Sequence, residues 1–138
     1  MPSSVPALFI KIIAGVMITG GWNGSRALAS TELFLPTSGK TCSLKSLPTA
    51  RSDHTLDQLG DGTILACGGV GAGTRCDKFT PSLPYGTWSQ YSSLISSRVQ
   101  HTSLAGQHEL LLMGGWNSEI TTELASGGQQ YNLTQGTM

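Results

Sequence analysis

The sequence predicts an all-β fold of repeated four-stranded sheets, on the evidence of three observations. Glycine doublets close short apolar runs at Gly20-Gly21, Gly68-Gly69 and Gly114-Gly115, and their first glycines lie 48 and 46 residues apart. A period of about 50 residues accommodates one four-stranded antiparallel sheet, the blade of a β-propeller. The content of 18 glycines and 12% charged residues favours short strands and tight turns. Other landmarks recur with the same period, as described next.

Two further sets of residues repeat at the offset of the doublets. Residues 51–54 (Arg-Ser-Asp-His) recur as residues 98–101 (Arg-Val-Gln-His), a shift of 47. Trp22-Asn23 after the first doublet recurs as Trp116-Asn117 after the third, and Thr31-Glu32-Leu33 recurs as Thr122-Glu123-Leu124. Because several landmarks share one spacing, we interpret residues 14–133 as a repeat region.

The repeat region divides into a partial blade (14–50) and two blades (51–97 and 98–133), with an apolar segment (1–13) before it and a tail (134–138) after it. The expected strands are 14–19, 31–35 and 41–44 in the first unit, 54–59, 63–68, 75–80 and 87–92 in the second, and 101–105, 109–113, 120–125 and 130–133 in the third. The first unit lacks an opening strand. The apolar run before each doublet is nearly continuous, which is typical of a strand covered on both faces.

We therefore expect a partial β-propeller of two to three four-stranded antiparallel blades. Closed propellers have about four to eight blades, so this chain is interpreted as a fragment of a larger propeller. Further blades or self-association would cover its apolar flanks. Residues 5–19 are too short for a membrane span and contain Lys11. They fit either a strand or a secretory signal, so the compartment stays open between extracellular and cytoplasmic.

The formal net charge is zero, and no basic stripe is present, which argues against a nucleic-acid partner. Cys67 and Cys76 flank a turn between strands expected to pair, and a disulfide or two buried thiols fit this placement equally. Cys42 is left over. Asn23 and Asn132 begin tripeptides that match the N-glycosylation pattern, which has force only if the chain is secreted.

The histidines favour structural roles over metal binding. His54 and His101 occupy equivalent positions beside Arg51 and Arg98, and each is expected to be hydrogen-bonded near the inner strand of its blade. No glycine-rich loop precedes a helix, no Gly-x-Ser-x-Gly elbow occurs, and the aspartates lack the spacing of a calcium loop. The sequence thus offers no catalytic constellation, no metal site and no cofactor.

These landmarks together resemble the kelch repeat: Arg-x-x-His, an apolar strand ending in Gly-Gly, an extended segment, and an aromatic residue such as Trp88 after a glycine. Departures include Cys42 where Trp88 stands in the second unit, and Leu33, Asp77 and Leu124 where a tyrosine is often found. They are similar to the divergent kelch-like proteins of invertebrate animals. The resemblance implies an interaction scaffold, although a few relatives, such as galactose oxidase, are copper enzymes.

The resulting interpretation is a non-catalytic scaffold that binds a protein partner through the loops after the doublets. Trp22, Asn23, Trp116 and Asn117 are the candidate contact residues, although the tryptophans would also fit a role in the core. One alternative is a secreted propeller related to galactose oxidase that handles carbohydrate. Another is a truncated gene product without independent function.

Overall fold

The computed structural model describes residues 15–82, 84–116 and 120–134. The described residues contain eleven strands and no helix. The strands are β1 (Val16–Thr19), β2 (Thr31–Leu35), β3 (Lys40–Leu44), β4 (Thr55–Gln58), β5 (Ile64–Cys67), β6 (Arg75–Thr80), β7 (Thr87–Ser93), β8 (Thr102–Ala105), β9 (Glu109–Met113), β10 (Thr122–Ser126) and β11 (Gln129–Asn132). The all-β prediction is confirmed. Each expected strand is present, and β1 and β10 each begin two residues later than expected.

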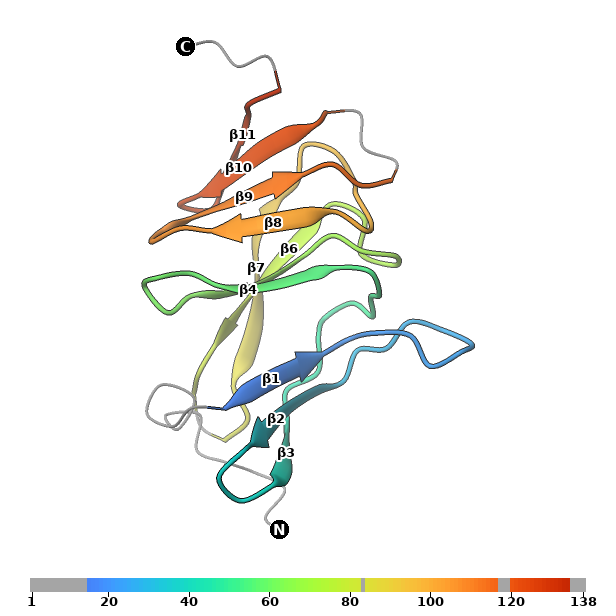
Figure 1. Cartoon of the computed structure of the whole chain (residues 1–138), viewed down its shortest axis with the longest axis vertical. Coiled ribbons are helices and arrows are strands. Elements are labelled where there is room, and N and C mark those ends of the chain that lie inside the picture. Colours follow the sequence, from blue (N-terminus) through green and yellow to red (C-terminus); the bar gives the residue numbers. More distant parts are fainter. Residues whose placement is uncertain (1–14, 83, 117–119, 135–138) are drawn as a thin grey trace.

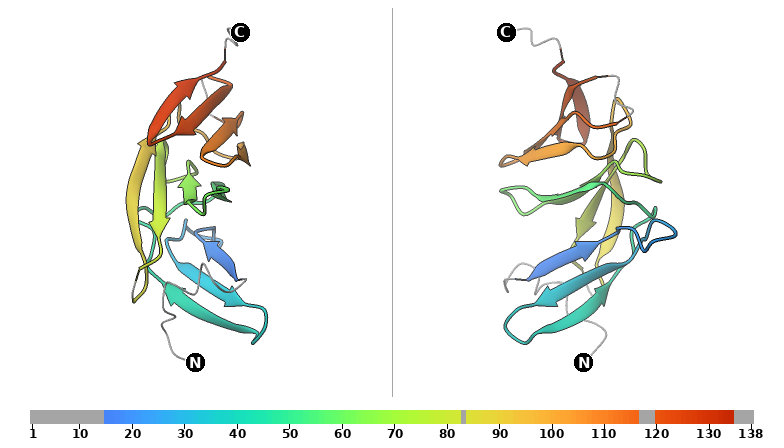
Figure 2. Two further views of the ribbon diagram at one scale, coloured as in Figure 1. Left: turned by 90° about the vertical axis from the view of Figure 1, so that its left-hand side faces the viewer. Right: turned by 45° about the vertical axis from the view of Figure 1, so that its right-hand side comes forward.

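The strands form three antiparallel sheets, and within each sheet the strands that follow one another in the sequence are hydrogen-bonded neighbours. Sheet 1 contains β1–β3, sheet 2 contains β4–β7, and sheet 3 contains β8–β11. Sheet 2 lies between the other two, with sheet 1 toward the bottom and sheet 3 toward the top of Figure 1 (see also Figure 2). Residues 1–14, where the N-terminal apolar segment was placed, and residues 135–138 of the tail lie outside the described residues.

The register of the middle strands aligns the three sheets residue by residue. Ile18 pairs with Glu32 in sheet 1, Ala66 with Asp77 in sheet 2, and Leu112 with Glu123 in sheet 3. A glycine doublet follows β1, β5 and β9 in each case. An acidic residue therefore occupies the same place in every sheet, directly across from the strand that leads into the doublet.

Two apolar clusters hold the sheets together. One joins sheet 1 to sheet 2 and includes Leu33, Leu44, Ile64 and Phe79. The other joins sheet 2 to sheet 3; its members are Leu59, Leu65, Cys67, Cys76, Leu94, Leu110, Leu112 and Ala125. Burial of these side chains supplies the main favourable free energy of packing between sheets.

Among the described strands, only β5 is covered on both faces. All four of its residues are buried, whereas β9 alternates between buried and half-buried positions and Thr19 is the one buried residue of β1. The expectation that every strand before a doublet is covered on both faces is therefore wrong for β1 and β9. The physical reason is that sheets 1 and 3 each pack against one neighbouring sheet, whereas sheet 2 packs against two.

Candidate functional site

The loops that follow the doublets lie along one side of the molecule, to the right in Figure 1. The residue directly after each doublet is a large apolar side chain: Trp22, Val70 or Trp116. Their exposed fractions are 58%, 43% and 69%. We call the surface formed by these three residues together with Asp53 and Gln100 the rim. Tryptophan is usually largely buried, so two tryptophans exposed at equivalent positions make the rim a candidate functional site.

Short backbone bridges hold the rim in place. Val70 pairs with Ser52, and Trp116 pairs with Val99, so each of these residues is fixed against the segment that leads into its own sheet. Trp22 pairs instead with Ala27 inside its own longer loop. The rim is thus built from loops that are tied to the sheets by backbone hydrogen bonds, as in many binding surfaces.

The glycine doublets make these close approaches sterically feasible. Gly20 and Gly68 have φ angles of 68° and 67°. A β-carbon added at Gly20 would lie 2.7 Å from the carbonyl oxygen of Arg51, and one at Gly68 would lie 2.6 Å from that of Arg98. Only glycine combines this left-handed backbone with so close a neighbour.

Two further residues of the rim adopt a rarely used backbone conformation. Asp53 and Gln100 both have a φ angle of 54°, and they occupy the same place in successive repeats. The amide of Gln100 donates to the carbonyl of Asp53 at 2.9 Å, which links the two segments. A shallow pocket of about 410 Å³ lies between Trp22, Ser52, Asp53 and Val70. The rim thereby combines apolar side chains with one carboxylate.

The asparagines predicted as contact or glycosylation residues differ in their structural surroundings. The Asn23 side-chain oxygen accepts hydrogen bonds from the amides of Ser25 and Arg26, both at 2.9 Å, and so shapes its own turn. Asn117 lies outside the described residues. Asn132 ends β11, and its side-chain oxygen accepts from the amide of Thr134 at 2.8 Å. Both Asn23 and Asn132 are exposed, on a loop and at a strand end.

Buried arginine–carboxylate pairs lie beneath the rim. Arg51 pairs with Asp77, and Arg98 pairs with Glu123 at 2.7 Å; all four side chains are 0% exposed. Arg51 also donates to the carbonyl of Ala66 at 3.0 Å. Burial lowers the pKa of Arg51, while its hydrogen bond to Asp77 opposes that shift.

These pairs tie the segment before each sheet to the middle of that sheet. Arg98 donates to the carbonyls of Gly114 at 2.9 Å and Ile120 at 3.1 Å. Glu123 also accepts from the amide of Ile95 at 2.8 Å and from Gln130 at 2.8 Å. Both terminal nitrogens of Arg98 and both carboxylate oxygens of Glu123 are hydrogen-bonded, whereas the buried Arg98 Nε atom has no partner among the described residues. The pairs therefore position the rim and are inaccessible to a ligand.

The two repeat histidines contact the preceding sheet. The Nε2 atom of His101 lies 3.0 Å from the hydroxyl of Thr55, and its ring faces Gly68. Burial and then Arg98 lower the pKa of His101 to about 4. Burial and then Arg51 lower the pKa of His54, whose ring faces Gly20. Both rings are thus held in the neutral state at neutral pH, and they lie in different interfaces between sheets.

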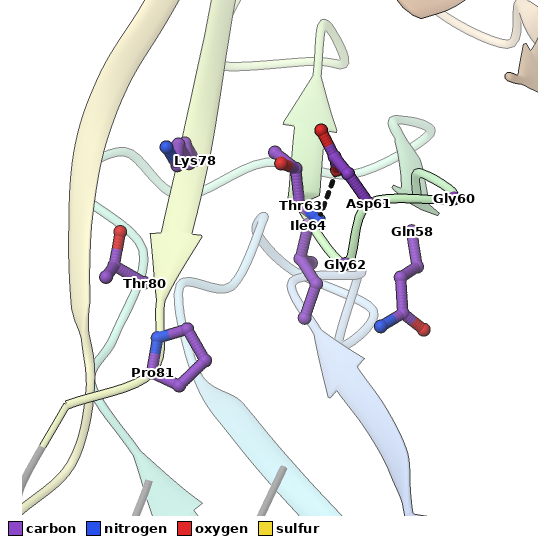
Figure 3. Close-up of a pocket in the computed structure, with 9 residues that line it drawn as sticks. All are labelled: Gln58, Gly60, Asp61, Gly62, Thr63, Ile64, Lys78, Thr80 and Pro81. Carbon is purple, nitrogen blue, oxygen red and sulfur yellow. Dashed lines mark hydrogen bonds between the residues drawn. The ribbon is translucent and has the colours of Figure 1, made fainter. Parts of the chain in front are cut away.

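A larger pocket of about 480 Å³ opens at the other end of sheet 2, beside the turn between β4 and β5 (Figure 3). Asp61 from this turn and Lys78 from β6 both line it. The Asp61 carboxylate accepts from the amide of Thr63 at 2.9 Å and lies 2.9 Å from His108 Nδ1. These contacts lower the pKa of Asp61 to about 2. The carboxylate is therefore already committed to local partners.

Cys67 and Cys76 form a disulfide between directly paired residues of β5 and β6. Both are 0% exposed and belong to the apolar cluster between sheets 2 and 3. Cys42 is buried in sheet 1, outside the disulfide.

Sequence reasoning missed Val70, Asp53 and Gln100 as members of the rim. Val70 follows its doublet as the tryptophans do, so its spacing was a usable signal, although its side chain is less conspicuous. The positive φ angles of Asp53 and Gln100 have no clear signature in their residue types.

No group of three or more His, Cys, Asp or Glu side chains within the described residues is arranged to hold a metal ion. No helix long and apolar enough to cross a membrane occurs in the part of the chain that the structure describes. No family model matches the chain, and no curated protein matches it.

Proposed function

We propose that this chain is a non-catalytic protein-interaction scaffold, built from kelch-type blades of a β-propeller, that binds a protein partner through the rim. Sheets 1, 2 and 3 correspond in this proposal to successive blades. The observation that carries it is the exposure of Trp22, Val70 and Trp116 at one repeat position, in loops that lie on one side of the molecule. Large rigid side chains in such places supply much of the free energy of protein interfaces.

The chemistry of the rim favours an extended peptide segment as the bound part. Trp22 and Val70 border a shallow pocket that also contains Asp53 and Ser52. A peptide with an apolar side chain flanked by a basic residue would bury the first against the tryptophan and place the second beside the carboxylate. The buried arginine pairs keep the loops in position, so little ordering is needed on binding.

The test is selection of peptides from a random display library on the purified chain. The double variant Trp22→Ser/Trp116→Ser is expected to lose at least about tenfold in affinity for the selected peptides, a loss of 1.4 kcal/mol or more. Tyr131→Ser provides the matched control, because Tyr131 is a similarly exposed aromatic residue on β11. Equal binding by the double variant and the unmodified chain would contradict the proposal.

A further inference from the structure

Each internal interface between sheets is closed by the same segment of chain. The amide of Gly21 donates to the carbonyl of Arg51 at 2.8 Å, and the amide of Gly69 donates to that of Arg98 at 2.9 Å. The His54 ring occupies the space beside Gly20, and the His101 ring occupies the space beside Gly68. The linker Arg-x-x-His therefore fills a socket, the space beside the first glycine of the preceding doublet.

The third socket, beside Gly114, is open. Gly114 has the same φ angle, 68°, as the other two first glycines. Nothing among the described residues comes within 4 Å of a β-carbon added there, and the Gly115 amide has no backbone acceptor in the same ranges. The third doublet thus has the same backbone conformation as the other two, but no Arg-x-x-His linker fills the space beside it.

The side chains around this socket repeat the pattern of a covered flank. Leu65 and Cys67 of β5 are 0% exposed because sheet 3 packs on them. Leu111 and Met113 occupy the equivalent places on β9 and are partly exposed. Leu104 of β8 is 64% exposed at the place where Asp57 of β4 bonds to Ser103 of sheet 3. This outer flank of sheet 3 is apolar and continuous with the socket.

The opposite flank of the molecule argues against a second copy of the chain as the occupant. Glu32 is exposed, whereas its equivalents Asp77 and Glu123 are covered by arginines. A second copy stacked in the same direction would bury Glu32 against Leu111 and Met113. In the two filled interfaces, an arginine and a histidine come from the segment that precedes the packed sheet. Residues 1–14, which would precede sheet 1 of the second copy, contain neither arginine nor histidine. A buried carboxylate without a partner is strongly unfavourable.

We infer that the outer flank of sheet 3 is a docking surface for a further β-sheet of the same type, preceded by its own Arg-x-x-His linker. The linker carbonyl would accept from the Gly115 amide, the histidine would fill the socket beside Gly114, and apolar side chains of the added sheet would cover Leu104 and Leu111. The inference rests on the repeat architecture of the proposed function, but it is independent of what the rim binds.

The test extends the full chain with a sheet of known sequence. A second copy of residues 93–133 is inserted between Leu133 and Thr134. The junction is in register, because Leu133 holds the place of Ser92: Leu133 donates its amide to the carbonyl of Thr122 at 3.0 Å, and Ser92 lies opposite Cys76, the equivalent of Thr122. The inserted copy brings Arg-x-x-His to the open socket.

The extended chain is expected to melt at least about 5 °C above the natural chain, given the stability added by one more packed interface. Gly114→Ala is expected to lower the melting temperature of the extended chain at least twice as much as that of the natural chain, since only there does the β-carbon meet a carbonyl. His101→Ala confined to the inserted copy is expected to remove part of the gain.

Two results would overturn the inference. One is an equal effect of Gly114→Ala in the two chains, or no rise in melting temperature on extension. The other is a defined dimer of the natural chain in light scattering that Leu111→Lys dissociates, which would make a second copy the occupant. Neither readout depends on peptide binding, so failure of the rim proposal is distinguished from failure of this one.

Discussion

The strands β5 and β9 hold equivalent places in sheets 2 and 3, yet their surroundings differ. Leu65 of β5 is fully buried against sheet 3, whereas Leu111 of β9 is partly exposed on the outer flank. A β-carbon added at Gly68 would meet the carbonyl of Arg98 and the ring of His101, whereas one added at Gly114 would have no described residue within 4 Å. Equivalent residues of β5 and β9 thus have different environments, because sheet 3 packs against β5 and no described sheet packs against the outer flank of β9.

A residue at a given repeat position acquires its structural role only when the next repeat packs against it. The side chains of β5 become core when sheet 3 packs on them, in the manner of repeat proteins whose stability is the sum of units and interfaces. The arginine pairs differ in this respect, because Arg98 and Glu123 lie within the segment and sheet of one unit. Their burial does not require a following sheet.

The largest expected effect breaks one of these pairs. Arg98→Met leaves Glu123 buried without its partner and should lower the free energy of unfolding by about 3 to 5 kcal/mol. Glu32→Gln, at the exposed equivalent of Glu123, should change it by less than about 0.5 kcal/mol. Urea unfolding followed by circular dichroism measures both.

The double variant Arg98→Met/Glu123→Met serves as the control for the arginine prediction. It should recover much of the loss, because no unpaired charge remains. A double variant as unstable as Arg98→Met would show that packing of the arginine, and not the buried carboxylate, dominates.

Leu65 and Leu111 are equivalent leucines whose truncation should have different costs on the covered and the open flank. Leu65→Ala should cost about 3 kcal/mol, because it leaves a cavity between sheets 2 and 3. Leu111→Ala should cost less than about 1 kcal/mol, because the outer flank is open and little burial is lost. Similar losses in urea unfolding would mean that the outer flank is covered in solution.

Stability should depend on pH through His101. Its pKa is about 4 in the folded chain and about 6.5 when unfolded, so between these values the unfolded state binds the proton more readily. The free energy of unfolding should therefore decrease as pH falls from about 6.5 to about 4, by up to about 3 kcal/mol, and this contribution should level off below that range. Thermal melts across this range measure it.

His101→Gln tests the assignment of this pH dependence. The variant should have a flatter profile between pH 6.5 and 4, with a residual slope from His54, whose pKa is lowered in the same direction. A profile as steep as that of the unmodified chain would assign the titration to other groups.

The smallest expected difference compares two glycines of the same backbone conformation. Gly68→Ala and Gly114→Ala both place a side chain at a φ angle near 68°, which costs about 1 kcal/mol in each case. Gly68→Ala should cost about 1 to 3 kcal/mol more, since its β-carbon would lie 2.6 Å from the Arg98 carbonyl. Equal costs in urea unfolding would indicate that the third socket is filled.

Much of the fold could be predicted from the sequence because its signals are local. The doublets, the turns and the alternating runs place every strand of the structure. The covering of each flank could not be predicted in the same way. The apolar runs before Gly20 and Gly114 are similar to the run before Gly68, but burial depends on the neighbouring sheet, to which the local pattern is insensitive.

Only part of the rim could be predicted, because the sequence signal depends on how conspicuous a residue type is. Trp22 and Trp116 are conspicuous residues with a shared spacing, whereas Val70 has an ordinary residue type at the same position. Asn23 matched the pattern of a contact residue, but its side chain bonds to its own turn. The arginine partners Asp77 and Glu123 were beyond sequence reasoning, since their pairing depends on contacts 26 and 25 residues apart.

Amide hydrogen exchange of the three second glycines tests most directly whether the outer flank of sheet 3 is an open copy of a closed interface. The amides of Gly21 and Gly69 donate to arginine carbonyls at 2.8 Å and 2.9 Å, and the Gly115 amide has no such acceptor in the described ranges. We expect Gly21 and Gly69 to exchange at least about 100-fold more slowly than Gly115 in the natural chain. Equal protection of Gly115 would contradict an open outer flank, because it would require that the third socket is already filled.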